Sequence, residues 1–161
     1  MGKTISIIMG SQSDLETVRE AINVLKEFKA GFEVKVLSAH RTPKELAHYV
    51  EEAPKKGMKV FIAAAGGAAA LAGVIASHTT LPVIGIPIET KSLKGLDSLL
   101  STAQMPAGVP VACMAIGKAG ARNAAIFALE ILGIFDEKIN AKLISYKKEM
   151  KLKIKKIKIK I

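Results

Sequence analysis

Short apolar runs alternate with segments of helical periodicity along most of the chain. The apolar runs are continuous rather than alternating, as in ISIIM at residues 5–9 and VFIAAA at residues 60–65. Continuous runs are typical of strands that are covered on both faces. We therefore expect strands at residues 4–9, 33–37, 59–64, 82–87 and 109–115.

A segment in which apolar residues recur every three or four positions follows the first expected strand, and helical patterns follow the others. The first segment carries Leu15, Val18, Ala21, Ile22, Leu25 and Phe28. Helices are expected at residues 14–28, 43–55, 71–77, 96–103 and 120–132. This repetition of strand and helix predicts an α/β fold, a three-layer αβα sandwich with a five-stranded parallel sheet.

The last part of the chain departs from this alternation. An extra C-terminal helix is expected to begin near Asp136, which caps it, and to run through Tyr146. We expect residues 1–146 to form a single domain, since a chain of 161 residues has the usual size of one. Residues 147–161 form a Lys/Ile-rich C-terminal extension whose spacing fits a strand and a helix equally well.

Residues 60–88 contain no Asp, Glu, Lys or Arg and are long enough to cross a bilayer, which takes about 20 apolar residues. Glycines, prolines and a histidine interrupt this stretch, so we expect a strand, a glycine loop, a buried helix and a further strand rather than a membrane span. The apolar run at residues 5–9 is also too short for the core of a secretory signal.

The cysteine content bears on the cellular compartment. The chain has one cysteine, Cys113, which excludes an intramolecular disulfide and a cysteine-based zinc cluster. We therefore expect a cytoplasmic protein. Cys113 itself is expected to be a small buried side chain of the fifth strand rather than a nucleophile.

The formal net charge of +10 favours partners that carry phosphate. Most of this charge lies in residues 147–161, whose eight lysines and one glutamate give a net +7 and leave +3 on residues 1–146. The chain also has five phenylalanines, two tyrosines, no tryptophan and no recognisable nucleic-acid-binding motif. The composition therefore argues against a nucleic-acid partner.

Three loops at strand ends carry the candidate chemistry, because ligands of doubly wound sheets bind beyond the carboxyl ends of the strands. The first loop, GSQSD at residues 10–14, offers a phosphate the hydroxyls of Ser11 and Ser13 and the amides of a helix N-terminus. Asp14 either accepts hydrogen bonds from ribose hydroxyls or caps the helix.

The second loop contains Ser38, His40, Arg41 and Pro43. Pro43 suits the first position of the next helix. The guanidinium of Arg41 suits a phosphate, while His40 offers an imidazole, a group that can transfer protons. The alternative is an ordinary His-Arg pair on the surface.

The third loop, residues 66–73, consists almost entirely of glycine and alanine. Such small residues let a flat ring lie against the backbone, or else let a helix pack closely on the sheet. No GxGxxG motif with an acidic partner and no P-loop lysine is present, so neither kind of nucleotide site is expected. His48 and His78 lack ligand-type neighbours at metal-site spacing, so no metal is expected.

Together these loops resemble those of the N5-carboxyaminoimidazole ribonucleotide mutases of purine biosynthesis, also described as the class I catalytic subunit of phosphoribosylaminoimidazole carboxylase. The resemblance spans residues 5–132 and rests on the segments IIMGSQSD, LSAHRTP, AGGAAALAG, LPVIGIPI, GLDSLLSTAQMPAGVPV and AIGKAGARNAAIFALEIL. It implies a flavodoxin-like sandwich assembled into a homo-octamer, with active sites at subunit junctions and the last helix reaching a neighbouring subunit.

The resemblance also implies a ribonucleotide site that needs no metal or organic cofactor. It implies that Ser11, Ser13, Ser38 and Arg41 bind the phosphate and that Asp14 binds the ribose. His40 then resembles the general acid/base that moves a proton while CO2 is transferred from the amino nitrogen to a ring carbon. The third loop completes the expected site with Gly66, Gly67, Ala68, Ala70 and Leu71.

The third loop departs from the family pattern at two positions. The family usually has GGAAHLPG, whereas this chain has Ala70 at the histidine position and Ala72 at the proline position. The departure leaves three alternatives to an active mutase. They are a carboxylase that uses CO2 directly, a catalytically impaired or deliberately altered enzyme, and a nucleotide-binding scaffold without catalysis.

Overall fold

A computed structural model describes residues 2–159 of the chain. The chain divides into two compact units, the first of which ends at Ala128 while the second begins at Leu129. All strands belong to the first unit, and the C-terminal helix belongs to the second. The expected strand-end loops therefore lie within the first unit.

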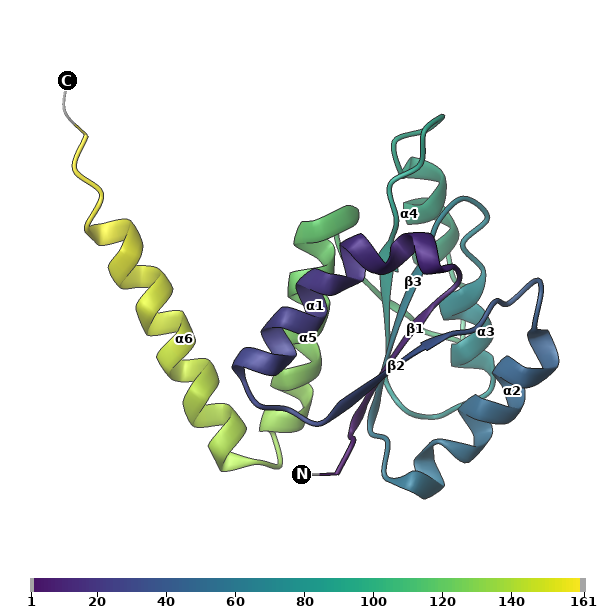
Figure 1. Ribbon diagram of the computed structural model, residues 1–161, viewed down its shortest axis with the longest axis horizontal. Helices are drawn as coiled ribbons and strands as arrows, with labels where there is room; N and C mark the ends of the chain where they lie inside the picture. The colour runs from purple at the N-terminus through teal and green to yellow at the C-terminus, as the bar shows by residue number, and fades with distance from the viewer. Residues whose placement is uncertain (1, 160–161) are drawn as a thin grey trace. The chain divides into compact units, whose positions relative to one another are not determined.

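Five parallel strands form the sheet of the first unit (Figure 1). They are β1 (Ile5–Met9), β2 (Phe32–Val36), β3 (Val60–Ala65), β4 (Val83–Pro87) and β5 (Ala112–Cys113). Their spatial order is β2-β1-β3-β4-β5, so β1 pairs with both β2 and β3. The expected five-stranded parallel sheet is confirmed.

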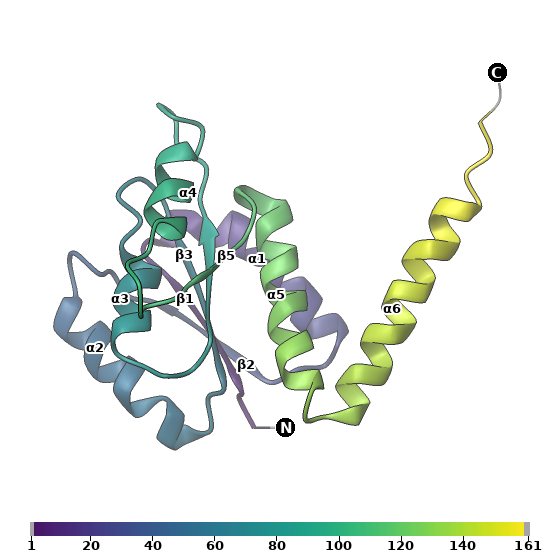
Figure 2. The same cartoon turned by 180° about the vertical axis from the view of Figure 1, so that it is seen from behind.

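Helices cover both faces of this sheet, as Figures 1 and 2 show from opposite sides. One face carries α1 (Leu15–Glu27) and the part of α5 (Gly117–Gly133) that belongs to the first unit. The other face carries α2 (Pro43–Glu52), α3 (Leu71–Ser77) and α4 (Leu96–Ala103). Two 3-10 helices, η1 (Gln12–Asp14) and η2 (Pro54–Lys56), precede α1 and follow α2. The three-layer αβα sandwich is confirmed.

Two elements are markedly shorter than expected, and a proline lies next to each. The strand expected at residues 109–115 is reduced to Ala112–Cys113, and its expected first residues are lost where Pro110 has no N–H with which to pair. The helix expected at residues 43–55 ends at Glu52, because Pro54 cannot continue an α-helix and begins η2 instead.

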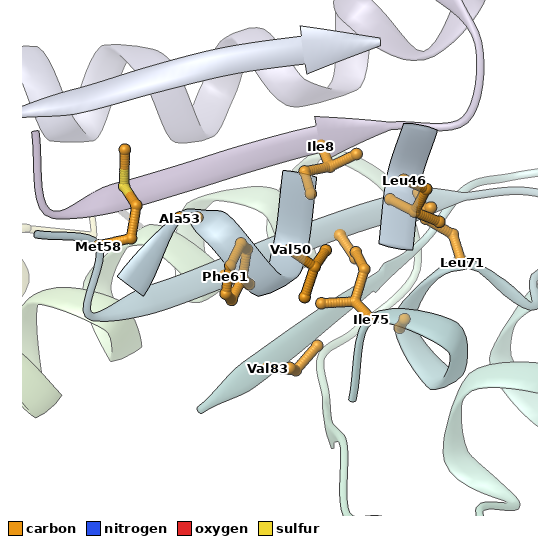
Figure 3. Packing of buried hydrophobic residues seen from close by; sticks show 11 residues of the cluster. Ile8, Leu46, Val50, Ala53, Met58, Phe61, Leu71, Ile75 and Val83 are labelled. Atoms are coloured by element: carbon orange, nitrogen blue, oxygen red, sulfur yellow. The ribbon is translucent and has the colours of Figure 1, made fainter. Parts of the chain in front are cut away.

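A hydrophobic core fills the space between the sheet and helices α2 and α3 (Figure 3). Ile8 of β1 and Phe61 of β3 contribute side chains without solvent exposure from the sheet. Leu46 and Val50 of α2 and Ile75 of α3 are equally buried and belong to the same cluster. This packing fixes both helices, and therefore the loops that precede them, over the ends of the strands.

A short polar chain also fastens α2 to the sheet. Tyr49 of α2 donates a hydrogen bond to the Glu33 carboxylate of β2 at 2.5 Å, and its hydroxyl lies 2.6 Å from Oγ of the fully buried Ser6 of β1. Burial, followed by the Glu33 hydrogen bond, raises the pKa of Tyr49 above its usual range. The hydrogen bond from Tyr49 is also the main reason why the pKa of Glu33 is lowered. The neutral phenol and the ionised carboxylate are therefore the stable forms of this pair.

The second unit contains α6 (Glu137–Lys155). The Asp136 carboxylate accepts hydrogen bonds from the backbone N–H groups of Lys138 (2.9 Å) and Ile139 (3.2 Å), which confirms the expected cap. The helix continues beyond Tyr146, so the Lys/Ile-rich residues as far as Lys155 are helical. Residues 160–161 of the expected extension lie outside the described residues. Between residues 2 and 159, no helix has the length and apolar composition that crossing a membrane requires.

We predict that Phe61→Ala lowers the free energy of unfolding by about 3–5 kcal/mol, because it leaves a cavity in the core beneath α2 and α3. Phe61→Leu keeps most of the buried volume and should cost clearly less. Urea unfolding of both variants, followed by circular dichroism, measures the difference. Equal stability of the wild type and Phe61→Ala would show that this core does not hold the helices on the sheet.

Candidate active site

A cavity of about 440 Å³ opens at the carboxyl ends of β1 to β4. The chain leaves β1 toward β2 on one side and later returns to β3 on the other, and loops that diverge in this way leave a crevice. Of the expected site residues, Gly67 does not line this cavity. The cavity is lined by Gly10, Ser11, Ser13, Asp14, Ser38, Ala39, His40, Arg41, Ala65, Gly66, Ala68, Ala70, Leu71, Ile88 and Glu89.

The first loop presents hydroxyl groups to the cavity. Oγ of Ser11 accepts a hydrogen bond from the backbone N–H of Ser13 (3.4 Å), and so caps η1, and it lies 3.0 Å from Oγ of Ser13. Asp14 occupies the N-cap position of α1, but its side chain makes no capping hydrogen bond. The capping alternative for Asp14 is therefore wrong, and its carboxylate is available for another role.

Asp14 is a buried acid that is held in place by its neighbours. Only 8% of its surface is exposed, and the Ser13 hydroxyl donates to its carboxylate at 3.2 Å. Burial raises the pKa of Asp14, while hydrogen bonds from the Ser13 hydroxyl and the Ser11 backbone, and the charge of Arg41, act in the opposite direction. The effect of burial is the larger, so the pKa of Asp14 is raised. Folding therefore disfavours the ionised carboxylate that would bind ribose hydroxyls.

Arg41 joins the first loop to the second. Its Nη2 donates a hydrogen bond to the carbonyl oxygen of Gly10 at 2.7 Å, and its Nε donates to Oγ of Ser38 at 3.4 Å. Thr42 closes the turn behind it, accepting from the Ser38 backbone N–H at 2.8 Å and donating to the Ser38 carbonyl at 3.1 Å. The guanidinium is thereby directed to the rim of the cavity, and its remaining N–H groups can donate to a phosphate.

His40 lies beside Arg41 on the same loop, and its side chain is exposed where it lines the cavity. Within residues 2–159, no side chain is shown hydrogen-bonded to its ring. An imidazole free of such a partner can accept or donate a proton without first breaking an internal hydrogen bond. The structure therefore brings a proton-transfer group and an anion-binding group to one cavity.

The third loop is held by α4. Gly67 has a φ of +68°, and its N–H donates to Oγ of the fully buried Ser98 at 2.9 Å. Ser98 in turn donates to the carbonyl oxygen of Ile88 at 2.7 Å, which links the loops after β3 and β4. The backbone amides of Ala69 and Ala70 are bonded within the loop. Gly67 thus supports the site from behind rather than lining it.

The loop after β4 also reaches the cavity, through Ile88 and Glu89. Sequence reasoning missed this loop because it considered only the ends of the first three strands. The strand pattern itself could have indicated it. Parallel strands end at the same edge of the sheet, and the residues after Pro87 follow the fourth of these strands.

The remaining titratable candidates lie outside the cavity. His48 is exposed on α2, and Nδ1 of His78 lies 3.0 Å from the Glu51 carboxylate as part of a surface pair. Cys113 is half-buried rather than fully buried, and burial raises the pKa of its thiol, which disfavours the reactive thiolate. Among the described residues, no cluster of His, Cys, Asp and Glu could hold a metal ion.

We predict that Asp14→Asn stabilises the fold at neutral pH. The folded-state pKa of Asp14 lies above its ordinary value, so the cost of burying the charge is absent well below roughly pH 4 and complete above the folded-state pKa. The gain in thermal midpoint should therefore be largest at pH 7 and shrink as the pH falls toward 4. A loss of stability at pH 7 would contradict this, and Glu27→Gln on an exposed part of α1 serves as control.

Comparison with known proteins identifies a family and named enzymes to which this chain is similar. Residues 4–153 match the family described as AIR carboxylase. The N5-carboxyaminoimidazole ribonucleotide mutase of Bacillus subtilis is 54% identical over 143 residues, which cover 89% of this chain and 88% of the relative. The mutase of Saccharolobus solfataricus is 52% identical over 147 residues, which cover 91% and 92%.

Solved structures agree with these relatives. The crystal structure of Treponema denticola PurE superimposes with a TM-score of 0.85 at 27% sequence identity, covering 94% of each chain. A Treponema denticola PurE2 variant gives a TM-score of 0.87, also at 27% identity, and covers 96% of this chain and 94% of its own. The expected flavodoxin-like class is confirmed, and the chain belongs to the AIR carboxylase family.

Proposed function

We propose that this chain is an N5-carboxyaminoimidazole ribonucleotide mutase of purine biosynthesis, which interconverts that compound and 4-carboxy-5-aminoimidazole ribonucleotide. The observation that carries the proposal is the adjacency of His40 and Arg41 on the rim of one cavity that the hydroxyls of Ser11 and Ser13 also line. Membership of the family and the names of relatives about half identical to the chain support the same activity.

The ribonucleotide phosphate binds at the ends of β1 and β2 in this proposal. Ser11, Ser13 and Ser38 supply hydroxyl donors, and Arg41 supplies a permanent positive charge that is already oriented by its bonds to Gly10 and Ser38. The ionised carboxylate of Asp14, the residue that follows Ser13, then accepts hydrogen bonds from the ribose hydroxyls.

His40 moves the proton of the reaction. As the N–C bond of the carbamate breaks, the protonated imidazole donates a proton to the amino nitrogen, and CO2 is released within the cavity. The ring carbon of the aminoimidazole then attacks the same CO2, and the neutral imidazole removes the proton from that carbon. The cycle ends with His40 protonated again, so the reaction is an isomerisation and needs neither a metal nor an organic cofactor.

The proposal extends to the assembly and surroundings of the chain. We expect a cytoplasmic homo-octamer whose partners are the ribonucleotide and CO2, with no nucleic acid. The exposure of the cavity in the single chain supports an oligomer, because a neighbouring subunit over His40 would exclude water and retain CO2. The single cysteine supports a reducing compartment.

Because Ala70 and Ala72 replace the histidine and proline usual in the family, a direct carboxylase, an impaired enzyme and a scaffold without catalysis are alternatives to the mutase. Activity assays distinguish them. Purified protein is assayed with N5-carboxyaminoimidazole ribonucleotide, and separately with aminoimidazole ribonucleotide and CO2. Efficient turnover of the carbamate supports the mutase. Turnover only of aminoimidazole ribonucleotide with CO2 would support a direct carboxylase, and binding without either reaction would support an impaired enzyme or a scaffold.

We predict that His40→Asn and Arg41→Ala separate catalysis from binding. His40→Asn should lower kcat by about 10²-fold or more, because no proton donor remains, while the Kd of the nucleotide changes little. Arg41→Ala should raise the Kd by roughly tenfold or more through loss of a charged hydrogen bond. Steady-state kinetics and calorimetry measure both quantities.

His48→Asn is the matched control for the histidine variant, because this imidazole lies on α2 outside the cavity. Its kinetics should equal those of the wild type. Full turnover by His40→Asn would contradict the proposed mechanism, since another group would then be moving the proton.

A further inference from the structure

The order of the strands gives the cavity two chemically different ends. The loops after β2 and β1 carry Arg41, His40, Asp14 and the serine hydroxyls, whereas the loops after β3 and β4 carry small and apolar residues and Glu89. Neighbouring strands lie about 4.8 Å apart, so the ends of β2 and β4 are separated by roughly 14 Å. A ribonucleotide bound as proposed above, with its phosphate at β2 and β1 and its ring within reach of His40, extends that ring toward β3 and β4.

We propose that Glu89 is a specificity-determining residue that accepts a hydrogen bond from the exocyclic amino group of the aminoimidazole ring. The proposal rests on the proposed function, because it takes the orientation of the substrate from the phosphate site. It assigns to the loop after β4 a role in distinguishing aminoimidazole ribonucleotides from other ribonucleotides.

The chemistry of the substrate leaves few partners for a carboxylate. An ionised carboxylate accepts hydrogen bonds and donates none. In aminoimidazole ribonucleotide, the form present once CO2 has left, the phosphate is a negative acceptor that a carboxylate repels. The ribose hydroxyls and the exocyclic nitrogen are the groups that donate, and the hydroxyls lie toward Asp14 in the orientation proposed above. The exocyclic N–H is the donor left for Glu89.

The surroundings of Glu89 hold its backbone in place while leaving its side chain free. Ile88, the preceding residue, is held at both backbone groups. Its carbonyl accepts a hydrogen bond from the hydroxyl of the buried Ser98, and the N–H of Ile88 donates to the Ala65 carbonyl at 2.9 Å. The following residue, Thr90, donates to the Asp97 carboxylate at 2.8 Å. Glu89 itself is exposed, and no ion pair within residues 2–159 engages it. The backbone of this loop is therefore fixed, and the carboxylate of Glu89 can accept a hydrogen bond from a ligand in the cavity.

The test compares two probes that differ in one group. Aminoimidazole ribonucleotide in CO2-depleted buffer and the same ribonucleotide without the amino group are titrated calorimetrically into wild type, Glu89→Ala and Glu89→Gln. Glu89→Ala should weaken binding of the amino compound by roughly tenfold, the effect of losing a charged hydrogen bond, and leave the other probe unchanged. Glu89→Gln should lose less, because its amide oxygen still accepts.

Two controls separate this proposal from the proposed function. Arg41→Ala should weaken both probes equally, and if it weakens neither, the phosphate site itself is wrong. Glu27→Ala, an exposed acid at the C-terminal end of α1, should change nothing. With the Arg41 effect intact, an equal loss for both probes in Glu89→Ala, or no loss for either, would overturn the role of Glu89 alone.

Discussion

The pairing of β1 with both β2 and β3 is the constraint on which the site depends. Because the chain crosses to one side of β1 before it returns to the other, the loops after these strands diverge at one edge of the sheet and leave a crevice there. The buried cluster that contains Ile8, Phe61 and Leu46 packs α2 against the central strands beside this edge. The polar side chains that line the cavity lie in loops, and the order of the strands determines which loops lie next to one another.

Hydrogen bonds between loops then convert the crevice into a site. Arg41 links the first two loops through the Gly10 carbonyl, and Ser98 links the last two through Gly67 and Ile88. Each link includes a hydrogen bond between residues that are far apart along the chain and that folding brings close together in space. Asp14 is an exception, because burial raises its pKa and the fold therefore bears a cost for an ionised carboxylate at the position proposed to bind ribose.

Much of the first unit could be predicted from the sequence because the relevant signals are local. Continuous apolar runs marked the strands, and Ser11, His40 and Arg41 stood in loops whose position follows from strand order. The structural role of Gly67 could not be predicted, because its partner Ser98 lies 31 residues away on another element. The reach of α6 beyond Tyr146 was equally hidden, since lysine and isoleucine spacing there fits either period. Glu89 carries no local signal of a binding site, since it is a single acid after β4 and enters the cavity only because β4 ends at the same edge of the sheet as β1 to β3.

The central claim is that one cavity holds a ribonucleotide with its phosphate at the ends of β1 and β2 and its ring beside His40. A crystal structure of the protein with bound 4-carboxy-5-aminoimidazole ribonucleotide tests this most directly. The phosphate should lie within hydrogen-bond distance of the Ser11 hydroxyl and the Arg41 guanidinium. A phosphate bound at the loop after β4, or a ligand bound outside this cavity, would contradict the assignment of the site.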